Sequence, residues 1–142
     1  MTVRLAHLCL RTGRFAEMTA FYRDALSLPV AFDLQLPDGR VFGRYFSLGE
    51  KSFLEVFDHA GATEMWGGDA GPVSPKPNST FQHFCLEVAG LEEYRASLVA
   101  RGLAVSDITT GMDNSRQAWI KDPDGNDIEL MEYTALSLQL AR

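Results

Sequence analysis

The chain contains 142 residues, of which 46% are hydrophobic and 23% are charged, and this composition is typical of one soluble globular domain with its own core. The formal net charge of −6 and the absence of basic runs argue against a nucleic-acid-binding protein, which would need cations to contact phosphates. No apolar stretch approaches the roughly 20 residues that a membrane-spanning helix requires, so no membrane partner is expected.

The opening sequence, MTVRLAHLCLRT, lacks the cationic region, the apolar stretch and the cleavage site of a secretory leader. The chain has two cysteines, Cys9 and Cys85, which are too few for a disulfide framework and suit a reducing compartment. We therefore expect a cytoplasmic protein.

The first half of the chain has the pattern of one strand, one helix and three further strands. Residues 3–10 alternate in polarity, which predicts a strand. Apolar residues at positions 15, 18, 22, 25 and 26 then follow helical spacing, and Pro29 comes after this helix. The three extended segments, with the turn sequence PDG (37–39) after the first, are at about 30–36, 41–48 and 52–58.

The segment that follows, DHAGATEMWGGDAGPVSPKPNST (58–80), is rich in Gly, Pro and Ser. This composition predicts a linker, about 59–80, or a mobile loop over a site. His59 lies in this segment and is expected at the surface. Met65 and Trp66 could form a lid over an apolar substrate or act as buried anchors, and the sequence does not decide between them.

The second half has the same pattern as the first. A predicted strand (81–88) precedes a helix with apolar residues at 91, 94 and 98, and Gly102 ends this helix. The three extended segments, with the turn sequence DPDG (122–125) between the last two, are at about 103–109, 116–121 and 127–133. Each half is therefore predicted to be a β-α-β-β-β module, the first over about 1–58 and the second over about 81–134, within a single domain 1–142.

Residue types recur between the halves in order and at nearly constant spacing. At an offset of 76, His7 aligns with His83 and Cys9 with Cys85. At an offset of 74, Tyr45 aligns with Trp119 and Glu55 with Glu129. We interpret the agreement in order, spacing and chemistry as an internal duplication.

Strand alternation places the repeated polar residues on one face of each predicted sheet. In RLAHLCLR, His7, Cys9 and Arg11 share a face, whereas the alternate apolar residues are expected to pack against the helix. The same alternation and the repeat assign Glu55 and Glu129 to the corresponding faces. A single strand histidine is usually structural and a single strand glutamate is usually solvated, but a repeated pair is harder to explain in that way.

Two imidazoles and two carboxylates form a ligand set for a divalent metal ion, because both groups bind Zn, Ni, Co, Fe and Mn and two carboxylates neutralise the ion's charge. The predicted metal ligands are His7, Glu55, His83 and Glu129. The neighbouring cysteines are expected to be small wall residues, since a thiolate site would cluster them.

HLCLR with the helix ending in FYRDALSLPV, together with KDPDGNDIELME, resembles the vicinal oxygen chelate superfamily, also called the glyoxalase/bleomycin resistance/dioxygenase superfamily. The resemblance covers nearly the whole chain. It implies an α+β fold in which two βαβββ modules form a half-barrel cup around a divalent metal ion. It also implies a small-molecule substrate and a homodimer, with the site within one chain or shared across the dimer.

Within this superfamily, the ligand order His, Glu, His, Glu is similar to that of glyoxalase I (lactoylglutathione lyase). That likeness implies a metal-dependent lyase or isomerase that acts on a small 2-oxo or thiohemiacetal-type substrate through a metal-stabilised enediolate. It implies that Glu129 is the catalytic base with Glu55 as its opposing partner. It also implies that Arg11 binds the glutathione part of the substrate.

The stretch GMDNSRQAWIKDPDG (111–125) departs from glyoxalase I, because it lacks that family's glycine- and lysine-rich sequence before the closing strand. Two other hypotheses therefore stay open. One is a different superfamily enzyme, an extradiol dioxygenase or an epimerase. The other is a non-catalytic protein that binds a drug or metabolite.

Overall fold

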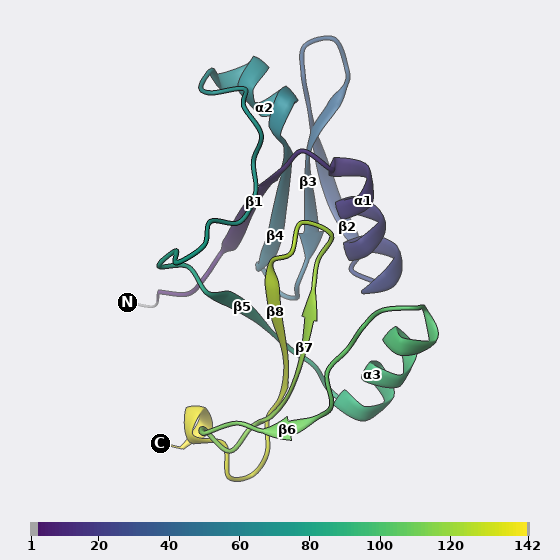
Figure 1. Cartoon of the computed structure of the whole chain (residues 1–142), viewed down its shortest axis with the longest axis vertical. Helices are drawn as coiled ribbons and strands as arrows, with labels where there is room; N and C mark the ends of the chain where they lie inside the picture. The colour runs from purple at the N-terminus through teal and green to yellow at the C-terminus, as the bar shows by residue number, and fades with distance from the viewer. Residues whose placement is uncertain (1–2, 142) are drawn as a thin grey trace. The chain divides into compact units, whose positions relative to one another are not determined.

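A computed structural model describes residues 3–141 and divides the chain into two compact units, one ending at Pro75 and one beginning at Lys76 (Figure 1). Met1 and Thr2, at the start of the N-terminal segment considered above, and Arg142 lie outside the described residues. Each unit has its own sheet and is described by itself. Over residues 3–141, no helix has the length and apolar character needed to cross a bilayer.

The first unit contains one open four-stranded sheet with the strand order β1-β4-β3-β2. β1 runs parallel to β4, and the other two pairs are antiparallel. The helix α1 continues directly into a π-helical segment, η1. In chain order the elements are β1 (His7–Thr12), α1 (Phe15–Thr19), η1 (Ala20–Ala25), β2 (Val30–Gln35), β3 (Val41–Ser47), β4 (Phe53–Asp58) and α2 (His59–Trp66).

The core of the first unit lies between the α1–η1 helix and the sheet. Met18 and Tyr22, which the helical spacing placed on one apolar face, are fully buried, and so are Leu54 and Val56 of β4. The Tyr22 ring packs against the ring of Phe46 on β3, with 5.7 Å between centroids. The helix thus buries the apolar face of β4, whereas Leu8 and Leu10, the β1 residues predicted to pack against it, are only half-buried.

Helix α2 occupies the beginning of the segment that the sequence predicted as a linker. Asp58 caps it, because its Oδ2 accepts a hydrogen bond from the Gly61 N–H at 2.9 Å. The helix packs on a small core formed with the β2–β3 hairpin and β4. Its members are Leu36, Phe42, Phe57 and Ala62, with Leu34 packed against them.

The prediction that His59 is a surface residue is wrong. The chain turns from β4 into α2 at Asp58, so His59 lies in the first turn of the helix and is buried. Among the residues that the structure describes, neither ring nitrogen of His59 has a hydrogen-bond partner. Trp66, at the end of α2, is more than half exposed but rests edge-on against Phe42 and Phe57.

The second unit repeats the arrangement of the first, with the strand order β5-β8-β7-β6 and with β5 parallel to β8. Both units are thus open βαβββ sheets, and the predicted α+β class is confirmed. In chain order the elements are β5 (His83–Glu87), α3 (Leu91–Ala100), β6 (Thr109–Thr110), β7 (Arg116–Lys121), β8 (Asp127–Glu132) and a short 3₁₀ helix, η2 (Leu138–Leu140).

The predicted strand 103–109 is much shorter in the structure, where β6 comprises only Thr109–Thr110. Side chains form hydrogen bonds with backbone groups of the preceding residues and of β7. The carbonyl of Ser106 accepts from Arg95 Nε at 2.6 Å, and the Ser106 hydroxyl accepts from the Trp119 N–H at 2.8 Å. One backbone hydrogen bond to β7 remains, from the Ser106 N–H to the Trp119 carbonyl at 3.0 Å, and the side-chain hydrogen bonds take the place of a longer ladder.

Glu132, the last residue of β8, caps the N-terminus of α3. Its Oε1 accepts hydrogen bonds from the N–H groups of Gly90, at 2.8 Å, and Leu91, at 3.3 Å. Its Oε2 accepts from Arg116 at 2.9 Å. The backbone donors, followed by the Arg116 charge, hold the pKa of Glu132 below its usual value of 4.5.

We expect Glu132→Ala to lower the free energy of unfolding by about 1–2 kcal/mol, because two N–H groups at the start of α3 lose their acceptor. Since folding lowers this pKa, the ionised carboxylate stabilises the native state above pH 4.5, and that contribution fades as the pH falls through the lower folded pKa. Urea unfolding at a series of pH values tests this. A stability difference that did not shrink at acidic pH would contradict it.

Candidate functional site

The strand register of the first unit aligns four side chains in one row across the sheet. Cys9 on β1 lies opposite Glu55 on β4, and Glu55 lies opposite Tyr45 on β3. Tyr45 in turn lies opposite Phe32 on β2. We call the sheet face that carries this row the site face of the first unit.

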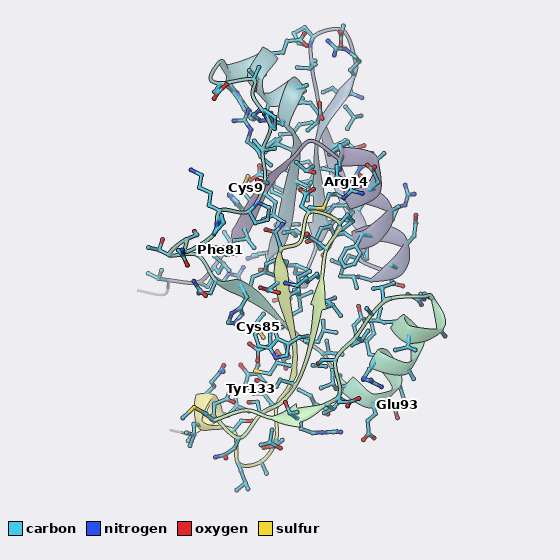
Figure 2. All side chains as sticks on the ribbon, in the orientation of Figure 1. Cys9, Arg14, Phe81, Cys85, Glu93 and Tyr133 are labelled. Atoms are coloured by element: carbon cyan, nitrogen blue, oxygen red, sulfur yellow. The ribbon has the colours of Figure 1, made fainter. Side chains whose placement is uncertain are left out.

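The second unit has the same register. Cys85 on β5 lies opposite Glu129 on β8, and Glu129 lies opposite Trp119 on β7. These are the pairs that the sequence repeat aligned with Cys9, Glu55 and Tyr45. Figure 2 labels Cys9 on β1 and Cys85 on β5, the equivalent strands of the two sheets.

Each unit brings one predicted histidine to its predicted glutamate. His7 Nε2 lies 3.5 Å from Glu55 Oε2, and His83 Nε2 lies 3.2 Å from Glu129 Oε2. Both histidines are the first residue of their strand rather than a central one. In both pairs the glutamate is the more buried partner, with 8% of the Glu55 side chain exposed against 50% for His7.

The geometry of each pair fits two ligands of one metal ion. Donors that each lie about 2.1 Å from an ion are about 3.0 Å apart at neighbouring octahedral corners and about 3.4 Å apart in a tetrahedron. The observed separations of 3.5 Å and 3.2 Å are close to these values. Within residues 3–141, no group of three or more His, Cys, Asp and Glu side chains lies at metal-binding spacing.

Tyr45 is a site residue that the sequence reasoning did not assign. Its hydroxyl donates a short hydrogen bond to Glu55 Oε1. Burial, followed by this hydrogen bond to Glu55, raises the pKa of Tyr45 to about 12, so the hydroxyl remains a neutral donor. The alignment of Tyr45 with Trp119 in the repeat was the signal for a position beside the glutamate.

The two cysteines are neutral thiols beside the glutamates. Burial, followed by the charge of Glu55, raises the pKa of Cys9 to about 12. Burial and the charge of Glu129 do the same for Cys85. Because the thiolate is the form that binds metals, these side chains are poor ligands in this state.

Arg11 lies at the end of the site face of the first unit that is nearest to α2. It is opposite Phe57 in the register, two residues beyond Cys9. Its Nη2 donates to the Thr63 hydroxyl at 2.9 Å and to the His59 carbonyl at 3.4 Å. The guanidinium therefore ties α2 to β1.

The sequence profile of the Glyoxalase/Bleomycin resistance protein/Dioxygenase superfamily matches residues 4–130 of the chain. The chain belongs to this superfamily. A comparison with curated protein sequences found no match.

Solved structures with the glyoxalase-superfamily fold align with nearly the whole chain. A lactoylglutathione lyase from Agrobacterium tumefaciens is 24% identical, with a TM-score of 0.64 over 92% of this chain and 94% of that one. A glyoxalase family protein from Enterococcus faecalis is 21% identical, with a TM-score of 0.69 over 91% and 97%. TnmS3, an antibiotic binding protein from Streptomyces sp. CB03234, is 20% identical, with a TM-score of 0.69 over 94% and 98%.

The site faces of the two units of this glyoxalase-superfamily chain differ in chemistry around the shared His–Glu pair. In the first unit, Phe53 lies opposite His7 in the register. In the second unit, Asp127 takes that place opposite His83 and forms an ion pair with Lys121. Both faces carry an aromatic residue opposite the glutamate, but the first has a second aromatic residue, Phe53, where the second has a charged one.

Proposed function

We propose that the chain is a metal-dependent lyase or isomerase similar to glyoxalase I and that His7, Glu55, His83 and Glu129 are ligands of a divalent ion, in a site formed within one chain or shared across a homodimer. The observation that carries this proposal is the repetition of one His–Glu pair at equivalent registers, with separations of 3.5 Å and 3.2 Å. The ligand order His, Glu, His, Glu supports a glyoxalase-type reaction on a small 2-oxo or thiohemiacetal-type substrate.

We infer different roles for the two glutamates in this reaction from their different environments. Glu55 is 6% exposed and is held by the Tyr45 hydroxyl. Glu129 is less buried, and Trp119, which has no hydroxyl, occupies the position equivalent to Tyr45. Glu129 is therefore the less constrained carboxylate and the better candidate for the base.

In the proposed reaction, the Glu129 carboxylate takes a proton from the hydroxyl-bearing carbon next to a carbonyl group and returns it to the former carbonyl carbon, while the hydroxyl proton passes to the former carbonyl oxygen. The exchange isomerises the substrate with no net gain or loss of atoms. When bound, a divalent ion supplies Lewis-acid stabilisation of the charge that develops on two neighbouring substrate oxygens. Arg11 contributes N–H donors that suit an anionic part of a thiol conjugate such as glutathione.

Metal titration tests the proposed site. We expect one divalent ion per chain when Ni, Co, Zn, Fe or Mn is added, as measured by calorimetry and elemental analysis. His7→Ala and His83→Ala should each weaken binding of that single ion by more than about 100-fold, because each removes a direct ligand. Two independent half-sites would instead leave one ion bound in each variant and would contradict the proposal.

A second candidate function is binding without catalysis, which the likeness to the antibiotic binding protein TnmS3 favours. The remaining alternative is another superfamily reaction, ring cleavage by an extradiol dioxygenase or epimerisation. Turnover of methylglyoxal with glutathione supports the isomerase. Oxygen uptake with Fe(II) supports the dioxygenase, and ligand binding that needs no metal and survives Glu129→Gln supports the binding protein.

The proposal includes a cytoplasmic homodimer. Cys9 and Cys85 are free thiols, as suits a reducing compartment. Sedimentation analysis measures the oligomeric state directly.

A further inference from the structure

An aromatic cluster lies beside the His7–Glu55 pair on the site face of the first unit. The rings of Phe32 and Tyr45 are stacked, with centroids 4.2 Å apart and planes at 19°. Phe53 meets both rings edge-on, at 6.4 Å from Phe32 and 6.2 Å from Tyr45. The cluster thus borders the donors directly, since the Tyr45 hydroxyl bonds Glu55.

Phe32 is the exposed member of this cluster. Tyr45 covers one side of its ring, yet 47% of the residue is open to solvent. Burying an aromatic ring usually stabilises a protein by a few kcal/mol. Because Phe32 is left open beside a row of polar donors, the protein lacks much of this stabilisation. A second planar group stacked on the open part of the ring would recover it.

The cluster is not required by the βαβββ module. In the second unit, β6 pairs only with Gln117 and Arg116, and the residue that lies against Trp119 is Ser106, whose N–H donates to the Trp119 carbonyl at 3.0 Å. That unit therefore forms its sheet without an aromatic counterpart of Phe32. The stacked pair is an addition specific to the first unit.

We infer that Phe32 selects ligands that carry a planar aromatic group directly beside two neighbouring oxygen atoms. This inference rests on the proposed function for the position of the oxygens, next to His7 and Glu55. Phe32 and Glu55 are separated by one strand, or roughly 10 Å between backbones. A ligand with a phenyl ring attached to a dicarbonyl group is long enough to pass over Tyr45, with its ring beside Phe32 and its oxygens beside Glu55.

Two small ligands isolate the effect of the ring. Benzoylformate and pyruvate carry the same neighbouring keto and carboxylate oxygens and differ in having a phenyl or a methyl group. We expect the metal-loaded protein to bind benzoylformate about ten-fold more tightly than pyruvate, as measured by calorimetry. Phe32→Leu should remove this preference, whereas Phe32→Tyr, which keeps the ring, should retain it.

Phe81→Leu is the matched control, because Phe81 is a similarly exposed phenylalanine outside the site face, labelled in Figure 2. Thermal unfolding of each variant shows whether the fold is intact.

Equal affinity for both ligands in the unaltered protein, or an unchanged preference in Phe32→Leu, overturns the inference. Loss of the preference in Phe32→Leu supports the inference even if methylglyoxal is not turned over. Lack of turnover would count only against the proposed reaction. If Phe32→Leu dissociates a dimer without changing the preference, Phe32 is an interface residue and the inference is wrong.

Discussion

Glu129→Gln should lower the turnover of methylglyoxal with glutathione by about 10²–10⁴-fold. The substitution keeps the size of the side chain but removes the carboxylate that accepts the proton. It also replaces a charged partner of His83, which lies 3.2 Å away. The measurement is kcat with the metal content of each sample determined in parallel, so that loss of the ion and loss of the base are separated.

Glu93→Gln is the control for this experiment, because Glu93 is an exposed residue of α3 with the same side chain (Figure 2). It should leave kcat unchanged. Glu55→Gln should act mainly through weaker metal binding, since Glu55 is held by Tyr45. Full activity and full metal occupancy in Glu129→Gln would show that the site is assigned wrongly.

Gly61→Ala should destabilise the protein by about 1–3 kcal/mol, although alanine is the better helix former. A Cβ atom at position 61 would lie 2.5 Å from the Cβ of Phe42. Phe42 belongs to the small core under α2, and its Cβ cannot move without its backbone. The helix must therefore shift away from β3, which also strains the hydrogen bond from Arg11 to Thr63.

Gly13→Ala provides the comparison, because a Cβ at position 13 would meet no atom within 4 Å. Equilibrium urea unfolding of both variants measures the difference in free energy. We expect little change for Gly13→Ala. A gain in stability for Gly61→Ala, as helix propensity alone would give, would contradict the close packing of α2.

The sequence repeat was sufficient to predict the βαβββ order of elements in both units. Strand alternation has a period of two, so aligning His7 with His83 and Glu55 with Glu129 also fixed the face on which each lies. That alignment makes the rows of the two sheets equivalent, but it does not set the register of neighbouring strands. The sequence could not predict side-chain contacts between neighbouring strands, because these depend on how the strands are paired in the folded sheet. The hydrogen bond from Tyr45 to Glu55 is such a contact.

The errors came from segments in which the repeat aligned no residues. Gly61 and the glycines after Trp66 gave the segment after Asp58 the composition of a linker, yet the glycine is there because Phe42 leaves no room for a side chain. Asp58 was a usable helix-capping signal. The predicted strand 103–109 failed because Arg95 donates to the carbonyls of Val105 and Ser106 and the Ser106 hydroxyl accepts from the Trp119 N–H of β7, which no local pattern reveals.

The irregular ladder between β2 and β3 also protects the chain from aggregation. β2 is the end strand of its sheet and exposes Val30 and Phe32, a combination that invites pairing with the same strand of another molecule. Its register shifts twice, between Val30 and Phe32 and between Leu34 and Gln35. These irregularities interrupt the straight row of backbone groups that another strand would need, so an open phenylalanine is tolerated at the edge of the sheet.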